Sequence, residues 1–263
     1  MRIWLPRGYH KEPTRRLPVL YLLDGQNVFG DSTAFAGVGW HTDETAQRLI
    51  DRGRIEPLLL VGVDNSGSQR TEDYTPVAWQ DRGGHASEFG SLLIDSIKPF
   101  VDAHYRTEPG REHTAIAGAS LGGLLSLHLG LTHPDVFGGV AALSPTLWWA
   151  RHFMLHELAA LHERVPVRIW LDFGKQEAAT GWLATQAFAE LLVEKGWREH
   201  RNARRADLRY REIARGRHDE ASWGRRFARV LTFLFPPPAK VRRRRVRTKQ
   251  PRALGAQRLL SGP

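Results

Sequence analysis

The chain contains no cysteine and no long apolar segment, and both absences narrow what it can do. Without cysteine it can form no disulfide, no thiolate metal site, no iron–sulfur cluster and no cysteine nucleophile. The longest apolar runs, such as residues 58–63, are far shorter than the roughly 20 residues of a membrane-spanning helix. We therefore expect no membrane span and no chemistry based on sulfur.

The first residues, MRIWLPRGYHKEP, also lack the apolar segment of a secretory signal. A cytoplasmic location is the resulting expectation. The 263 residues, of which 41% are hydrophobic, are enough for one large domain with a sizeable core.

Basic residues are concentrated at one end of the chain. Of the net charge of +10, +9 lies in residues 239–263, which contain no acid, and this leaves +1 for residues 1–238. Blocks of like charge repel one another and resist folding. We therefore divide the chain into a folded domain, residues 1–238, and a basic, disordered tail, residues 239–263. Weak, non-specific binding of polyanions is the function that such a tail predicts.

Short apolar runs alternate with segments of helical periodicity. The predicted strands are residues 17–24, 56–64, 113–119, 140–144, 167–173 and 208–213. The predicted helices are residues 42–51, 88–104, 121–132, 184–194 and 222–234. Continuous rather than alternating apolarity in the strands indicates a mostly parallel sheet with helices on both faces, so the predicted fold class is α/β.

Ligand sites in such sheets lie at the carboxyl ends of the strands, and polar residues collect there in this sequence. The segment GASLGG, residues 118–123, contains the G-x-S-x-G pattern between a predicted strand and a predicted helix. Tight turns of this kind expose a serine, here Ser120, as a nucleophile.

A serine nucleophile needs a base and an acid that orients the base. Among the twelve histidines, only His218 follows a late strand and precedes a helix. Glu177 and Asp172 both lie near the end of the preceding strand. We prefer Glu177, which falls in the loop, and keep Asp172 as the alternative. The order Ser120, Glu177, His218 is that of α/β-hydrolases.

An oxyanion hole requires two backbone N–H groups. The residue after the nucleophile, Leu121, would supply one of them. The loop after the first long strand, at Gln26, would supply the other.

The strings LYLLDGQNVF, LLLVGVDN, GASLGG, SPTLWW and GRHDEASW resemble an esterase branch of the α/β-hydrolases. That branch includes enterochelin (siderophore) esterases, feruloyl and acetylxylan esterases, S-formylglutathione hydrolases and mycolyltransferases. The resemblance covers roughly residues 15–235. It implies an α/β-hydrolase fold with little or no cap domain, because only a short helical excursion fits between Ser144 and Val165.

Carried over by position, the resemblance supports the same catalytic and oxyanion residues. It also implies four substrate-binding residues: Trp148, Trp149, Arg70 and Tyr74. For the last two, a structural clamp is the alternative. Relatives usually have more chain before Leu17, and residues 1–9 resemble the tail of an antiparallel strand in a trimmed sheet. The acid is also a glutamate where many relatives have aspartate.

We therefore predict a serine hydrolase that cleaves a small-molecule carboxylic ester through an acyl-enzyme, with no cofactor and no metal. An acyltransferase with the same triad is one alternative. A non-catalytic binding protein that acts through its basic tail is the other. The sequence predicts no oligomeric state.

Overall fold

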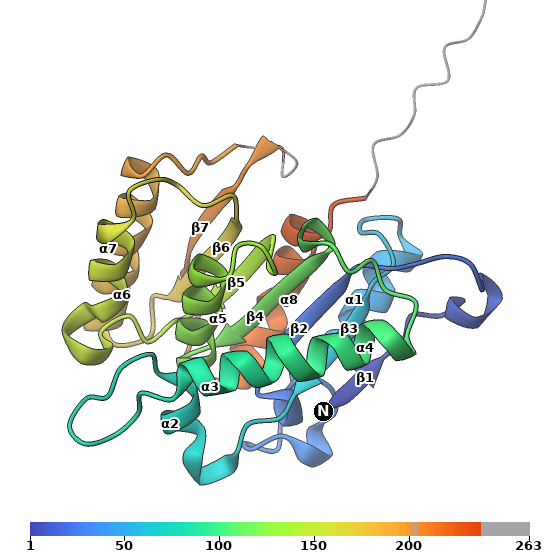
Figure 1. Cartoon of the computed structure of the whole chain (residues 1–263), viewed down its shortest axis with the longest axis horizontal. Coiled ribbons are helices and arrows are strands. Elements are labelled where there is room, and N and C mark those ends of the chain that lie inside the picture. The colour runs from blue at the N-terminus through green and yellow to red at the C-terminus, as the bar shows by residue number, and fades with distance from the viewer. Residues whose placement is uncertain (201, 203–204, 238–263) are drawn as a thin grey trace, which may run out of the picture.

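A seven-stranded sheet forms the centre of the computed structural model, which describes residues 1–200, 202 and 205–237 (Figure 1). The strands are β1 (Arg2–Trp4), β2 (Val19–Leu23), β3 (Leu59–Val63), β4 (Thr114–Ala119), β5 (Gly139–Leu143), β6 (Arg168–Gly174) and β7 (Leu208–Ile213). Their order across the sheet is β1-β3-β2-β4-β5-β6-β7. Only β1 is antiparallel to its neighbour in this sheet, and the other pairs are parallel. The predicted α/β class with a mostly parallel sheet is confirmed.

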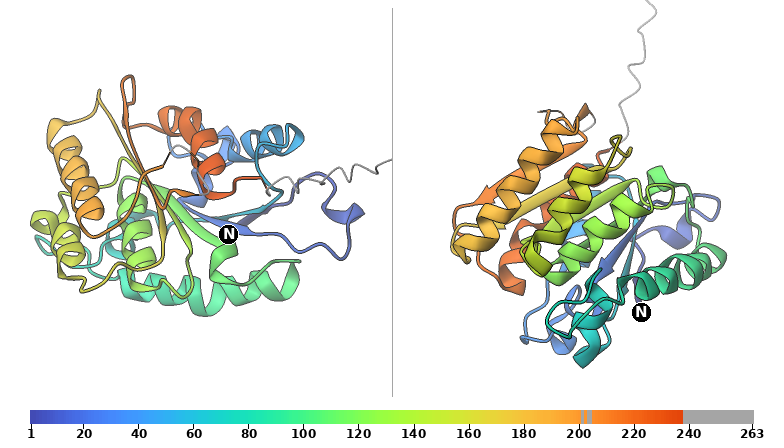
Figure 2. Two further views of the ribbon diagram at one scale, coloured as in Figure 1. Left: turned by 90° about the horizontal axis from the view of Figure 1, so that it is seen from above. Right: turned by 60° about the vertical axis from the view of Figure 1, so that its left-hand side comes forward.

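Helices cover both faces of the sheet (Figure 2). They are α1 (Thr42–Asp51), α2 (Arg70–Tyr74), α3 (Ala86–Ser91), α4 (Lys98–His104), α5 (Leu121–Thr132), α6 (Trp149–Ala160), α7 (Ala179–Glu194) and α8 (Glu220–Leu234). Helices α1 and α8 pack together on one face. The segment α3–α4 and helices α5, α6 and α7 cover the other face.

The central strands β2 and β3 are apolar throughout because each face of the sheet is buried there, whereas the edge strand β7 has charged residues and is partly exposed. In β2, Tyr21 and Leu23 belong to the core under α5, whereas Leu20 and Leu22 belong to the core under α8. All four side chains are at most 1% exposed. A strand with one solvent-facing side would instead alternate apolar and polar residues.

The observed elements follow the predicted ones closely, but the short helix α2 was not predicted and two predicted helices differ from those observed. Helix α7 begins at Ala179, five residues before the predicted start at 184, although Thr180 and Gly181 have low helix propensity. Gly181 and Ala184 are buried, so packing overrides propensity there. The predicted helix 88–104 is interrupted by a π-helical segment, Leu92–Ile97, between α3 and α4. The predicted antiparallel strand within residues 1–9 is present as β1.

No helix in the described part of the chain is long and apolar enough to cross a membrane. The segment between β5 and β6 holds α6, which is the short helical excursion that the sequence predicted there. The predicted basic tail, residues 239–263, lies outside the described residues.

The partly buried imidazole of His128 on α5 makes the stability of this fold depend on pH. Burial, with a smaller contribution from the charge of His133, lowers the pKa of His128 from 6.5 to about 4. Between these values the unfolded chain binds a proton that the folded chain does not, so the free energy of unfolding falls as the pH is lowered from about 6.5 to about 4. In urea titrations across this window, His128→Leu should lose less stability on acidification than the wild type. Parallel losses in the two proteins would contradict this assignment.

Candidate active site

Ser120 lies on a strained turn between β4 and α5. Its backbone has φ 58° and ψ −122°, a conformation that residues other than glycine rarely adopt. The flanking glycines allow the strand and the helix to approach: a Cβ on Gly118 would lie 2.5 Å from the carbonyl carbon of Gly122. The predicted strand–turn–helix context of the G-x-S-x-G segment is therefore present.

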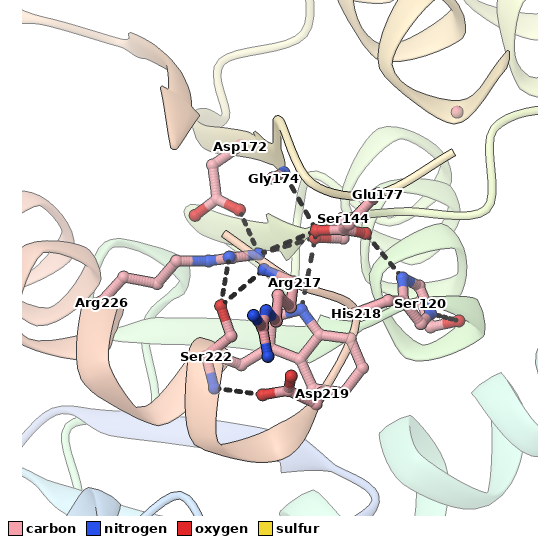
Figure 3. Close-up of polar contacts among 12 residues, drawn as sticks. Ser120, Ser144, Asp172, Gly174, Glu177, Arg217, His218, Asp219, Ser222 and Arg226 are labelled. Atoms are coloured by element: carbon pink, nitrogen blue, oxygen red, sulfur yellow. Dashed lines mark hydrogen bonds and ion pairs between the residues drawn. The ribbon is translucent and has the colours of Figure 1, made fainter. Parts of the chain in front are cut away.

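His218 lies between Ser120 and Glu177 (Figure 3). Its Nε2 is 3.0 Å from Ser120 Oγ, and its Nδ1 is 2.7 Å from Glu177 Oε2. The imidazole packs edge-on against Trp223, with ring centroids 4.9 Å apart. The structure thus brings these three predicted residues into one chain of hydrogen bonds, in the tautomer where Nδ1–H donates to the carboxylate and Nε2 accepts from the hydroxyl.

Glu177 is held in place by further donors. Its side chain is 1% exposed, whereas that of His218 is 48% exposed. Glu177 Oε1 accepts a 2.7 Å bond from Ser144 Oγ and a 3.0 Å bond from the Gly174 amide. The guanidinium of Arg226 lies 3.9 Å from the same oxygen. A carboxylate with these partners keeps its other oxygen, Oε2, directed at the imidazole.

Asp172, the alternative acid, faces away from His218. It lies inside β6 and is fully buried. Trp170 Nε1 donates to its Oδ2 at 2.9 Å, and Arg226 Nη2 lies 3.0 Å from its Oδ1. Burial raises the pKa of the Asp172 carboxyl, and the positive charge of Arg226 opposes this rise. Of the two candidate carboxylates, Glu177 is the one in contact with the imidazole.

Sequence reasoning missed the role of Arg226 in this site. Its side chain is 3% exposed, and its Nη2 donates to Ser144 Oγ at 2.6 Å. Trp223, one turn earlier on α8, approaches the same oxygen with its indole nitrogen at 3.3 Å. An arginine on an amphipathic helix is usually solvated, so nothing in the pattern of residues 222–234 singled it out. Ser144 was recognisable as a polar residue that follows a strand at the same sheet edge.

The two predicted oxyanion donors lie beyond the ends of neighbouring strands. Leu121 is the first residue of α5, and Gln26 lies in a short 3-10 helix, Gly25–Asn27, that follows β2. Strands β2 and β4 pair in parallel, with Leu22 opposite Ala117. The first amides of a helix have no carbonyl partner within it and favour an anion. The side chain of Gln26 binds the backbone of the neighbouring loop, where its Oε1 accepts a 3.2 Å hydrogen bond from the Asn65 amide.

Arg70 and Tyr74 both hold the turn at Asp24. Arg70 binds the Asp24 carboxylate through Nε at 2.6 Å and Nη2 at 2.8 Å. Tyr74 is fully buried, and its hydroxyl accepts a 3.1 Å bond from the Asp24 amide. The expectation that Tyr74 contacts substrate is corrected on this point, because its ring has no exposed surface. Both residues make the contacts of a structural clamp, whereas Arg70, with a side chain that is 28% exposed, also stays a predicted substrate contact.

The two adjacent tryptophans face different surroundings. Trp148 is 43% exposed and lines a cavity of about 180 Å³ together with Phe173 and His218. Trp149 is only 8% exposed, and its indole nitrogen donates to the Val77 carbonyl at 2.9 Å. The expected substrate contact of Trp149 is therefore also corrected, since its side chain belongs to the core. Trp148 remains the tryptophan that a bound molecule could touch.

Comparisons with known proteins show which family this chain belongs to. The family model Esterase, described as "Putative esterase", matches residues 1–234. A ferri-bacillibactin esterase of Bacillus subtilis (strain 168) is 31% identical over 171 residues, which are 58% of this chain and 56% of that protein. A siderophore triacetylfusarinine C esterase of Aspergillus fumigatus is 34% identical over 152 residues, which are 56% of this chain and 50% of that protein. The matches thus span about half the length of these curated relatives.

A solved structure shares the fold. An IroE-like serine hydrolase from Shewanella oneidensis matches 88% of this chain and 73% of its own, with a TM-score of 0.70 and 20% sequence identity. At this identity the match concerns the fold alone. It agrees with the α/β-hydrolase architecture that the motifs implied.

Because Arg226 is the counter-ion of the buried Asp172, Arg226→Met should destabilise the protein strongly. Removing one partner of a buried ion pair typically costs about 3–5 kcal/mol, since the other charge is left uncompensated. The double variant Asp172→Asn/Arg226→Met should recover part of this loss, because the amide carries no charge. Urea unfolding of the single and double variants measures both effects.

Arg225→Met is the matched control, because Arg225 is the exposed neighbour of Arg226 on α8. Its effect should stay within about 0.5 kcal/mol, as is usual for surface substitutions. Strictly additive losses in the double variant would contradict the ion pair between Asp172 and Arg226.

Proposed function

Because this chain belongs to the Esterase family, we propose that it hydrolyses a small-molecule carboxylic ester through an acyl-enzyme formed on Ser120. The observation that carries the proposal is the continuous series of hydrogen bonds from Ser120 through His218 to the buried carboxylate of Glu177. This arrangement supplies a nucleophile, a base and an orienting acid at the carboxyl edge of the sheet.

In the first half of the proposed reaction, Ser120 Oγ attacks the ester carbonyl carbon while His218 Nε2 takes its proton. The carbonyl oxygen gains the negative charge of the tetrahedral intermediate. We assign its stabilisation to the amides of Leu121 and Gln26. As the intermediate collapses, the bond to the alcohol oxygen breaks, and the protonated His218 donates its proton to the leaving alcohol.

In the second half, water replaces the alcohol. His218 Nε2 takes a proton from water as the water oxygen attacks the acyl carbon. The bond between the acyl carbon and Ser120 Oγ then breaks, His218 returns the proton to Oγ, and a carboxylic acid leaves. Glu177 stays ionised throughout and stabilises the imidazolium that forms twice in each cycle. Its three additional partners, Ser144, Gly174 and Arg226, support this role because they hold the carboxylate in contact with the imidazole.

The cavity beside Trp148 supports an ester with a bulky or aromatic acyl group. It opens next to His218, and the exposed indole offers a flat apolar surface. The names of the two curated relatives are those of siderophore esterases, which agrees with a bulky ester as the substrate class. An acyltransferase would use the same three groups, so product analysis with an added alcohol distinguishes transfer from hydrolysis.

Substitution of the proposed triad should abolish hydrolysis of p-nitrophenyl acetate without unfolding the protein. Ser120→Ala removes the nucleophile, and Glu177→Gln should lower turnover by about 10²–10⁴-fold because the imidazolium loses its counter-charge. Steady-state kinetics and circular dichroism on each purified variant check both points.

Asp172→Asn is the control for the identity of the acid. Since Asp172 does not contact His218, its loss should reduce turnover much less than Glu177→Gln does. A folded Asp172→Asn variant that is more impaired than Glu177→Gln would overturn the assignment of Glu177.

Trp148→Ala should weaken the use of aromatic acyl esters selectively. Loss of one ring contact of about 1.4 kcal/mol corresponds to a tenfold drop in kcat/KM. We expect this drop for p-nitrophenyl benzoate and little change for p-nitrophenyl acetate, with Trp148→Phe retaining most of the preference. Equal losses for the two esters would show that the indole does not contact the acyl group.

A further inference from the structure

A second pocket lies near the amino ends of the parallel strands, whereas Ser120 follows the carboxyl end of β4. It has a volume of about 440 Å³ and lies between the first residues of β7 and the last turns of α8. His218 lies two residues before α8 begins at Glu220, and α8 lines the pocket with Arg229, Thr232 and Phe233. At 1.5 Å per residue the pocket therefore lies about 14–20 Å along α8 from the end of the helix next to His218. It cannot belong to the proposed active site.

Four arginines line this pocket, and no acidic residue does. They are Arg54, Arg209, Arg211 and Arg229. Arg54 and Arg229 are exposed and have no carboxylate partner in the described part of the chain. Arg211 has only a loose ion pair, with its Nη1 3.5 Å from Glu199 Oε1. Arg209 donates to the His200 carbonyl at 2.7 Å.

The remaining segments of the chain cannot neutralise this pocket with a side-chain carboxylate. Residues 201, 203–204 and 238–263 contain no aspartate and no glutamate. The like charges also disfavour one another: burial and the charge of Arg211 lower the pKa of Arg209. An anionic ligand would remove this repulsion, and a guanidinium matches the geometry of a phosphate group.

The position of the pocket favours a polymer of phosphates over a single one. Pro236 and Pro237 form part of its wall, and residues 239–263, with a charge of +9, follow directly in the sequence. A chain of phosphates bound at the arginines would therefore lie close to the point where this basic segment begins. Neither element needs to recognise a base to bind such a chain.

A membrane surface fits the same pocket less well. Peripheral membrane binding uses exposed apolar side chains next to the basic ones. None of the large hydrophobic side chains that are exposed in the described residues lines this pocket. Its aromatic residues, Trp170 and Phe233, are 3% and 2% exposed, so they form a floor and offer no surface for stacking a base.

We propose that the arginine pocket, defined by Arg54, Arg209, Arg211 and Arg229, binds the phosphate backbone of nucleic acid without reading its sequence. This binding function is separate from ester hydrolysis and would hold the enzyme on a polyanion while its active site stays open at the other edge of the sheet.

The test is fluorescence anisotropy of a labelled 20-nucleotide oligothymidine with the full-length protein, titrated between about 50 and 300 mM salt. Each phosphate contact with a single strand contributes about 0.7 to the slope of log K against log salt concentration. The double variant Arg54→Gln/Arg229→Gln should reduce this slope by about 1.4 and weaken binding about tenfold or more at the lowest salt. A labelled oligonucleotide of mixed sequence should give the same result.

Arg215→Gln/Arg225→Gln is the matched control, since it removes the same charge from two exposed arginines beside the active site. It should leave the slope within about 0.5 of the wild-type value. Equal losses in the two double variants would overturn the proposal, because they would show that net charge alone causes binding. An unchanged slope in Arg54→Gln/Arg229→Gln would overturn it as well.

Two further measurements test whether the variant is still folded and active and whether a lipid surface is the preferred ligand. Hydrolysis of p-nitrophenyl acetate by Arg54→Gln/Arg229→Gln should equal that of the wild type, which shows that the variant is folded and that loss of binding does not depend on the esterase activity. Phosphatidylserine vesicles should compete poorly with the oligonucleotide. Tighter binding to the vesicles, dependent on the same two arginines, would overturn nucleic acid as the ligand.

Discussion

The guanidinium of Arg226 lies between two buried carboxylates, and the geometry of the proposed active site depends on this contact. Arg226 comes from α8, whereas Asp172 and Glu177 belong to β6 and the loop that follows it. The contact therefore ties the helix that follows His218 to the strand that precedes Glu177. Arg226 approaches Oε1 of Glu177, and the other oxygen of that carboxylate, Oε2, contacts the imidazole.

The turn that holds Ser120 is also bonded through the backbone to the turn that holds Ser144. Ser120 and Ser144 follow the neighbouring strands β4 and β5, and both have positive φ angles, of 58° and 43°. The Ser120 amide donates to the Leu143 carbonyl, and the Thr146 amide donates to the Ser120 carbonyl. Backbone hydrogen bonds to neighbouring strands and turns thus fix both strained residues at one edge of the sheet, since the Ser144 amide in turn donates to the Asp172 carbonyl. A sheet edge of this kind holds side chains in position more firmly than a free loop.

The strands were predictable because burial on both faces of the sheet leaves continuous apolar runs, as in β2 and β3. Most helices were predictable because their apolar residues recur with helical periodicity. The choice between Glu177 and Asp172 was open in the sequence, since it depends on where β6 ends and on which way each side chain points. The resemblance implied that Tyr74 and Trp149 contact substrate, but a match in sequence does not give the direction of a side chain, and both side chains are buried. The role of Arg226 could not be predicted either, because its partners Asp172, Glu177 and Ser144 lie far from it in the sequence.

Covalent labelling tests most directly whether Ser120 is the nucleophile. Diethyl p-nitrophenyl phosphate transfers its phosphoryl group to an activated serine, and the adduct is stable enough for mass spectrometry of the intact protein and its peptides. We predict one adduct per chain, located on Ser120, formed slowly by Glu177→Gln and absent from Ser120→Ala. No adduct on the native protein, or an adduct on another residue that persists in Ser120→Ala, would contradict the proposed mechanism.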